Sequence, residues 1–285
     1  VKKLVEEKII TDFYPIINIE KLGYLRNGCG IQLKGISLEK EKEFFSYLIY
    51  HPNVTFIGVV MGRWNVAFDI ISKDKTHLIK IIQEIIEDVK PYIENYFVTN
   101  SSTEQETYPT KVLGVKQKID PHFDNSEIEI DMIDKKILAL LSVNSRIDYV
   151  ELSTKLKLTA NAIKYRIKNL ESKKIILGYT ISIDATKLGF EYYNIQIKLD
   201  SEIKDIDLKS FLRTHPRIIY FYKYLGQEDW DLDIGVIAKN SRDLREVIVE
   251  FRSGIGRMMK IKEIFTNVEI LKGDIVPKGV FEQKI

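Results

Sequence analysis

Four polar residues recur at helical spacing in the middle of the chain, and their side chains could read DNA. They fall at i, i+3, i+4 and i+7, on one face of a helix: Asn161, Lys164, Tyr165 and Lys168. An asparagine amide can form two hydrogen bonds with adenine in the major groove, and lysine amines bind phosphates or base edges. The pattern predicts a helix that presents amide, amine and phenol groups to a DNA groove.

The helix that carries these residues is expected from Ala160 to about Ser172. On its other face, Ile163, Ile167 and Leu170 form an apolar stripe that would pack inward. Thr159 is the expected N-cap, and its hydroxyl could also reach a phosphate.

A shorter helix is expected before it, from Tyr149 to Leu156, with Asp148 as N-cap. Only residues 157–159 separate the two helices, which is typical of a helix-turn-helix. The phenol of Tyr165 has a second interpretation, in which it packs against Tyr149 instead of facing DNA.

Basic charge is concentrated on the same segment. Residues 144–174 hold eight basic and three acidic side chains, although the net charge of the whole chain is only +2. This is the pattern expected for phosphate binding. Arg146, Arg166 and Lys168 are the predicted phosphate contacts; for Arg146, a solvated loop arginine is an equal alternative.

Composition restricts the class of protein. A length of 285 residues suggests two or three domains, and 45% hydrophobic with 29% charged residues is typical of a globular protein. No apolar run is long enough to cross a membrane and no export signal is visible, so we expect a cytoplasmic protein. The single cysteine, Cys29, is expected to be buried in a strand. No metal site, cofactor or catalytic residue is predicted.

The chain also repeats itself at an offset of about 166 residues. Lys8-Ile9-Ile10 recurs as Lys174-Ile175-Ile176, and Trp64 recurs as Trp230. Each copy has strand and helix patterns in the order βαββαβ, which predicts two ferredoxin-like units. The expected elements are 27–34, 38–50, 54–61, 64–72, 75–90 and 94–99 in the first copy, and 192–199, 208–214, 218–225, 230–238, 241–254 and 261–270 in the second.

Three further expectations follow from the repeat. The bare sheet faces of the two units should pack together. Ser241 should cap the last helix of the second unit, while His51 and His215, each before a helix-ending turn, should be capping or turn residues. Residues 1–8 align with the end of the DNA-reading helix, so we expect that residues preceding Val1 are absent from this chain.

The central segment resembles the Lrp/AsnC family, the feast/famine regulators. The stretches that carry the resemblance are Ile133–Leu138, Asn144–Ile147, Glu151–Ser153, Leu158-Thr159, Arg166–Glu171 and Ile176–Thr180. The resemblance implies a regulator of transcription that binds double-stranded DNA, forms homo-oligomers through ferredoxin-like domains and senses a small effector such as an amino acid.

We therefore expect an α+β fold with two ferredoxin-like βαββαβ domains flanking a winged helix-turn-helix. The expected parts are a recognition-helix remnant and linker strand (1–24), a first ferredoxin-like domain (25–119), a linker (120–128), the helix-turn-helix domain (129–183) and a second ferredoxin-like domain (184–285).

The effector site is expected at the loop that joins the two central strands of each ferredoxin-like unit. The residues concerned are Gly226, Asp229 and Trp230 in the second unit and Gly62, Arg63 and Trp64 in the first. Asp229 could hold an ammonium group while amides near Gly226 hold a carboxylate. In the alternative interpretation the loops are simple turns and both tryptophans are core residues.

Two other functions stay open. The same architecture occurs in siroheme decarboxylases, which would make the chain an enzyme, although such a site needs cationic and histidine groups in a cleft. The chain could also be a sensor subunit that does not bind DNA. We expect a regulator and no enzymatic activity.

Overall fold

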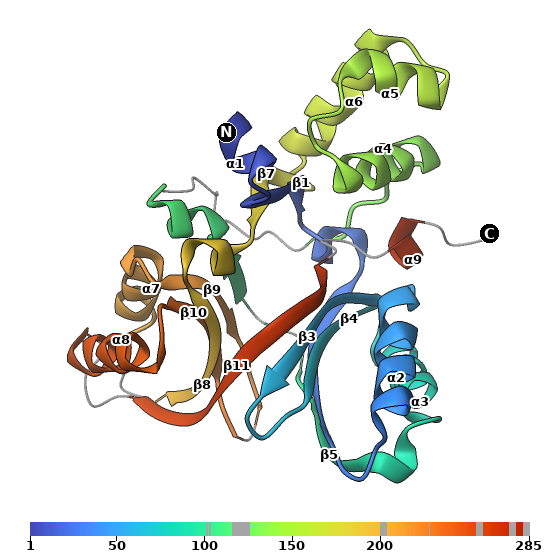
Figure 1. Ribbon diagram of the computed structural model, residues 1–285. Coiled ribbons are helices and arrows are strands. Elements are labelled where there is room, and N and C mark those ends of the chain that lie inside the picture. Colours follow the sequence, from blue (N-terminus) through green and yellow to red (C-terminus); the bar gives the residue numbers. More distant parts are fainter. Residues whose placement is uncertain are drawn as a thin grey trace.

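The computed structural model describes residues 1–100, 102, 104–115, 126–199, 204–227, 229–254, 259–273 and 278–281. Two α/β units lie side by side, and a small helical domain stands above them (Figure 1). In the described part of the chain, no helix is long and apolar enough to cross a membrane.

The helical domain is the predicted helix-turn-helix, preceded by one further helix. It comprises α4 (Met132–Val143), α5 (Tyr149–Leu156) and α6 (Ala160–Ser172). Side chains cap all three N-termini, as Asp131, Asp148 and Thr159 accept hydrogen bonds from backbone N–H groups of the first turn. The bounds predicted for α5 and α6 are confirmed.

A two-stranded ribbon joins this domain to the units below. Strand β1 (Ile10–Ile17) pairs antiparallel with β7 (Ile176–Ile183), and each strand follows a helix, α1 (Lys2–Glu6) or α6. Lys8 and Lys174, which the repeat aligns, both have left-handed backbones, with φ of 54° and 58°. The chain therefore turns in the same way from helix to ribbon at both places.

Both ferredoxin-like units have the predicted order. The first contains β2 (Leu25–Leu33), α2 (Leu38–Tyr50), β3 (Val54–Met61), β4 (Val66–Ser72), α3 (Lys75–Ile86) and β5 (Ile93–Val98). The second contains β8 (Glu191–Leu199), α7 (Asp205–Thr214), β9 (Ile218–Lys223), β10 (Leu232–Ala238), α8 (Ser241–Gly254) and β11 (Met259–Gly273). The predicted α+β class is confirmed.

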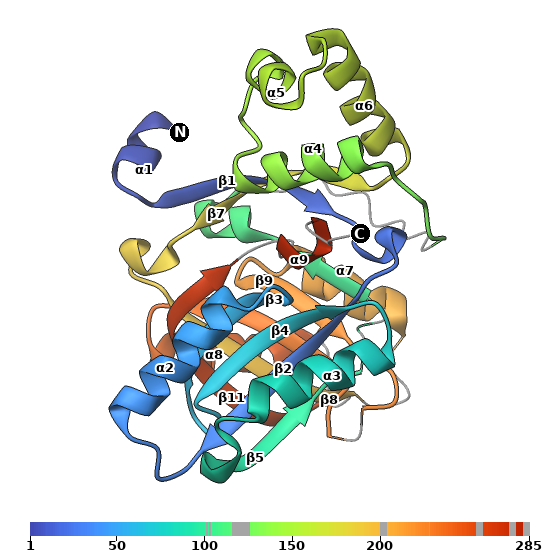
Figure 2. The same ribbon diagram turned by 90° about the vertical axis from the view of Figure 1, so that its right-hand side faces the viewer.

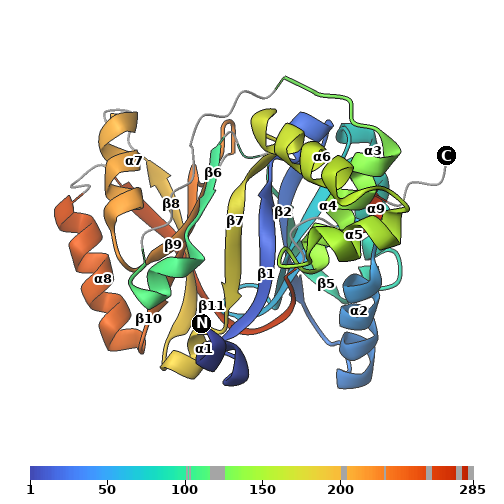
Figure 3. The same ribbon diagram turned by 90° about the horizontal axis from the view of Figure 1, so that it is seen from above.

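The helices of each unit cover the outer face of its sheet, so the two sheets face each other. Viewed from above, α2 and α3 lie outside one sheet and α7 and α8 outside the other (Figure 3). The strands β1 and β7 lie above the two units (Figure 1). Alternate strand residues build a core under each helix pair, for example Phe68 in the first unit and Phe221 in the second. Cys29 is buried in the first of these cores, as predicted.

Strands extend from each unit into the other, which the sequence did not predict. The fifteen-residue β11 pairs with β8 of its own unit and then with β3 of the first. In return β6 (Glu104–Thr107), which follows β5, pairs with β9 of the second unit. The result is one sheet in the order β5-β2-β4-β3-β11-β8-β10-β9-β6.

Short helices complete the chain. They are the 3₁₀ turns η1 (Glu20–Leu22), η2 (Lys90–Tyr92), η3 (Pro109–Leu113) and η4 (Ala185–Leu188), and the C-terminal α9 (Lys278–Phe281). The equivalent turns η1 and η4 both end at a left-handed glycine, Gly23 and Gly189. Val280 of α9 packs into the helix-turn-helix core.

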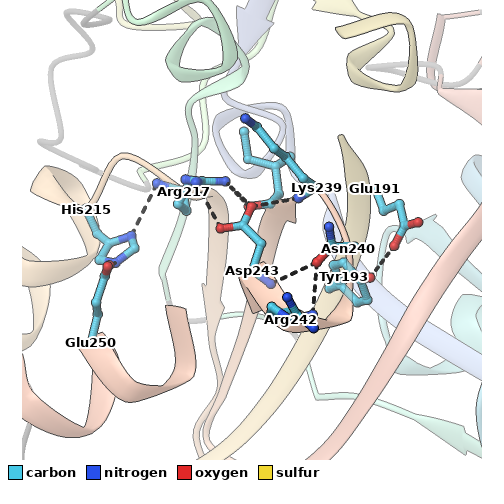
Figure 4. Close-up of polar contacts among 10 residues, drawn as sticks. Glu191, Tyr193, His215, Arg217, Lys239, Asn240, Arg242, Asp243 and Glu250 are labelled. Carbon is cyan, nitrogen blue, oxygen red and sulfur yellow. Dashed lines mark hydrogen bonds and ion pairs between the residues drawn. The ribbon is translucent and has the colours of Figure 1, made fainter. Parts of the chain in front are cut away.

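The N-terminus of α8 shows one wrong prediction. Asn240, not Ser241, supplies the cap, because its side-chain oxygen accepts hydrogen bonds from the N–H groups of Arg242 and Asp243 (Figure 4). Asp243 in turn pairs with Arg217, 2.8 Å from its Nη1. The bond from Lys239 N–H, together with Arg217, holds the pKa of Asp243 below its usual value.

Candidate nucleic-acid interface

The polar face predicted for α6 is exposed. Asn161, Lys164, Tyr165 and Lys168 all point away from the apolar stripe, whose members Ile163, Ile167 and Leu170 are buried. Tyr165 is 73% exposed, so it does not pack against Tyr149 in the way the alternative interpretation required. The helices α5 and α6 lie at the end of the molecule farthest from β5 (Figure 2).

Thr159 positions this face by fixing the start of α6. Its hydroxyl accepts a hydrogen bond from Ala162 N–H at 3.2 Å. The preceding turn is closed by Lys157, whose backbone is left-handed with φ of 55°. The N-terminal turn of α6 therefore carries free N–H groups and the Asn161 amide at the exposed end of the motif.

Arg166 is an exception among the predicted phosphate contacts. Its Nη1 lies 2.7 Å from Asp131 and 2.8 Å from Asp134, so the guanidinium ties α6 to α4. Hydrogen bonds to Asp134 and Asp131 raise the pKa of Arg166. These two ion pairs fasten α6 to α4, and phosphate binding by Arg166 stays a prediction.

Arg146 is exposed, and its guanidinium lies 4.7 Å from the ring centre of Phe13 in β1. Ser145 N–H also donates to the Phe13 carbonyl at 2.8 Å. These contacts fasten the loop between α4 and α5 to the ribbon. Phosphate binding by Arg146 stays a prediction, now with a defined position beside β1.

The two tryptophans of the predicted effector loops are core residues. Trp64 and Trp230 are 3% and 4% exposed. Phe97 lies between them, with ring centres 4.8 Å from Trp64 and 5.1 Å from Trp230, both edge-on. Arg63 covers the outer face of Trp64 at 4.8 Å. The structure thus supports the core interpretation for both tryptophans and joins the two loops through one aromatic stack.

The polar residues of the second loop divide into two groups. Asp229 is exposed, whereas Asp231, which the sequence did not single out as a site residue, bonds Lys198 and Leu199 N–H, each at 2.9 Å. Gly226 is left-handed with φ of 74°, and the adjacent Leu225 carbonyl accepts a hydrogen bond from Asn100 of the other unit. In the first unit, Gly62 packs against Phe265, where a Cβ would be 3.1 Å from the Phe265 Cβ.

Between the facing sheets lies a partly open cavity, lined by both polar and apolar side chains, that sequence reasoning missed. Its volume is about 290 Å³, and Arg26, Asp69, Asn194, Tyr222 and Asp233 are among its lining residues. Burial raises the pKa of Asp233 to about 7, and nearby Asp69 adds to the effect. The signal in the sequence was one acidic residue within each of two apolar strands, β4 and β10.

The described histidines lie away from the inter-sheet cavity. His51 and His215 end α2 and α7, and the Nδ1 atom of each accepts a hydrogen bond from the backbone two residues later, as predicted for turn residues. Burial lowers the pKa of both. Neither lines the inter-sheet cavity, and nor does His77. His122 lies outside the described residues. Within the described ranges, no group of three His, Cys, Asp or Glu side chains is placed to hold a metal ion.

The overall architecture is also found in solved structures of another protein. Two structures of the siroheme decarboxylase NirDL superpose with a TM-score of 0.65 at 12% identity; the one with an iron-uroporphyrin III analogue covers 98% of this chain and 84% of that chain. At that identity the likeness shows the shared fold alone.

Sequence comparison is more specific. Residues 130–171 match the AsnC-type helix-turn-helix domain. An uncharacterised HTH-type transcriptional regulator of Pyrococcus furiosus is 33% identical over 150 residues, which are 52% of this chain and 97% of that protein. The regulator LrpB of Bacillus subtilis is 32% identical over 109 residues, 38% of this chain and 73% of LrpB. The chain therefore belongs to the Lrp/AsnC family of helix-turn-helix transcriptional regulators.

Proposed function

We propose that this protein binds double-stranded DNA in a sequence-specific manner through α6 and thereby regulates transcription. The observation that carries the proposal is the exposed polar face of Asn161, Lys164, Tyr165 and Lys168 on a capped and buttressed helix. The described part of the chain contains one helix-turn-helix, which reads one half-site, so we propose that the working unit on DNA contains at least two chains.

Substitutions on this face should weaken DNA binding without unfolding the protein. We expect Lys164→Ala and Asn161→Ala each to lower affinity for a fragment of the protein's own upstream region by about 1–3 kcal/mol. Lys42→Ala, an exposed lysine on α2, is the matched control and should bind like the wild type. Fluorescence anisotropy at several salt concentrations measures this, because phosphate contacts make the affinity fall as salt rises. Binding that ignored both substitutions would remove α6 from the interface.

The loop between β9 and β10 is our candidate site for an amino-acid-like effector. Its support is the exposed Asp229 carboxylate beside the left-handed Gly226, at a junction that also includes Asn100 of the other unit. One solved regulator structure, from Neisseria meningitidis, is a complex with L-methionine.

Thermal-shift measurements with the twenty amino acids test this site. We expect hits to stabilise the wild type and to lose at least tenfold in affinity with Asp229→Ala, because the ammonium partner is removed. The control is Glu39→Ala, at an exposed position of α2, which should leave the shifts unchanged. An aspartate such as Asp74 is unsuitable as a control because it caps α3. Equal shifts in wild type and Asp229→Ala would make Asp229 a turn residue only.

The enzyme alternative has less support. A decarboxylase of this architecture would need histidine and cationic groups facing its cleft. Of the described side chains that line the inter-sheet cavity, the one cation is Arg26, and it is paired with Asp69. We therefore propose a regulator and not an enzyme.

A further inference from the structure

The charged groups around the inter-sheet cavity do not balance. Arg26 Nη1 lies 3.3 Å from Asp69 Oδ2, which pairs the one cation among the described lining residues. Glu106, also in the lining, is held by Arg213, whose Nε donates to both of its carboxylate oxygens.

Among the described residues, the hydrogen-bond partner of Asp233 is neutral. Asn194 Nδ2 donates to its Oδ1 at 3.3 Å, and Asn194 also bonds the hydroxyl of Tyr220. The side-chain amide of Gln196 lies close enough to lower the pKa of Asp233 somewhat. Amide donors stabilise a carboxylate but do not neutralise it, so an ionised Asp233 leaves the cavity with one uncompensated negative charge.

Aromatic rings form much of the wall around this carboxylate. Tyr220 and Tyr222 come from β9 and Tyr224 follows directly after this strand; the others are Phe56, Phe97 and Phe265. A buried carboxylate within aromatic walls is the combination that recognises an organic ammonium group, through the ion pair and through ring faces.

We propose that the inter-sheet cavity is a binding site for a small organic monocation, a protonated amine whose ammonium group pairs with Asp233. A volume of about 290 Å³ suits a compact molecule of roughly ten non-hydrogen atoms. A zwitterionic amino acid fits less well, because its carboxylate would enter a cavity that already holds Asp69 and Asp233. The site is separate from the loop that carries Asp229.

The cavity also touches the ribbon that leads to the helix-turn-helix. Tyr14, Ile16 and Ile17 of β1 and Leu177 of β7 are in its lining. Ile17 belongs at the same time to the helix-turn-helix core, together with Ile167 of α6. An occupant therefore contacts strands that position the DNA-reading helix, and this regulatory consequence rests on the proposed function.

Binding should be linked to protonation. The titratable and charged groups that line the cavity with Asp233 are Asp69, Arg26, Tyr14, Cys29, Tyr220, Tyr222, Tyr224 and Glu106. With the pKa of Asp233 raised to about 7, a sizeable fraction of the empty protein is protonated there at neutral pH. A bound ammonium favours the ionised carboxylate, so binding at pH 7 should release part of a proton.

Isothermal titration calorimetry of the protein without DNA tests the site. Each of two amines is compared with the amino acid that carries one additional carboxylate. The probes are 2-phenylethylamine against phenylalanine and isopentylamine against leucine, each in two buffers of different ionisation enthalpy. We expect at least one amine to bind at least tenfold more tightly than its amino acid, with proton release at pH 7. Asp233→Asn should weaken that binding at least tenfold and abolish the proton release, while Glu39→Gln, at an exposed position of α2, should leave both unchanged. Asp229→Asn is measured alongside to distinguish this site from the loop between β9 and β10.

Three results would overturn the proposal: no binding of either amine at millimolar concentration, equal binding by Asp233→Asn, or a loss confined to Asp229→Asn. A parallel anisotropy titration of promoter DNA, with and without the amine, is read separately. Amine binding without DNA binding would refute the proposed function but keep the site. DNA binding without amine binding would refute the amine site but keep the proposed function.

Discussion

At pH 8 we expect the Asp233→Asn variant to be more stable than the wild-type protein. Burial raises the pKa of Asp233 from 3.8 to about 7 in the folded state. The folded protein therefore keeps a proton that the unfolded chain loses, and stability falls as the pH rises from about 4 to about 7. The full shift corresponds to about 4 kcal/mol, and solvent screens part of it because Asp233 is only partly buried, so a loss of about 2–4 kcal/mol is expected.

Urea denaturation of both proteins at pH 5 and pH 8 measures the effect. Asparagine keeps the shape and the acceptor oxygen but carries no charge, so the advantage of the variant should be largest at pH 8 and shrink toward pH 4. Asp69→Asn is the matched contrast: it leaves the buried Arg26 without its carboxylate and should destabilise the protein at pH 8. If the free energy of unfolding changed with pH in the same way for wild type and Asp233→Asn, the pKa of Asp233 would not be raised in the folded protein.

The helix-turn-helix could be predicted from the sequence because its signals are local. Capping by Asp148 and Thr159 and the stripe of Ile163, Ile167 and Leu170 act within a few residues, and the structure confirms them. The role of Arg166 could not be predicted in the same way. Its partners Asp131 and Asp134 lie more than thirty residues upstream, and a count of charges does not show which arginine is already paired.

The cavity was missed for a related reason. A strand with alternating residues such as Phe68, Asp69 and Ile70 predicts one buried face, but alternation does not tell whether the other face meets water or a second sheet. The exchange of β6 and β11 between the units decides that question, and four-residue β6 has no strong pattern of its own. The sequence predicted that the bare sheet faces pack together, but not that Asp69 and Asp233 line a cavity between them.

Trp230→Ala should destabilise the protein by about 3–5 kcal/mol, the loss expected when a large buried aromatic side chain is removed. Trp230 is 4% exposed and packs edge-on against Phe97, which reaches Trp64 of the other unit, so the substitution opens a gap where the two units join. Asp229→Ala, one residue away and exposed, is the control and should change stability by less than about 0.5 kcal/mol. Urea denaturation followed by far-ultraviolet circular dichroism distinguishes them. If Trp230→Ala instead kept its stability and lost amino-acid binding, Trp230 would belong to the effector site and not to the core that joins the two sheets.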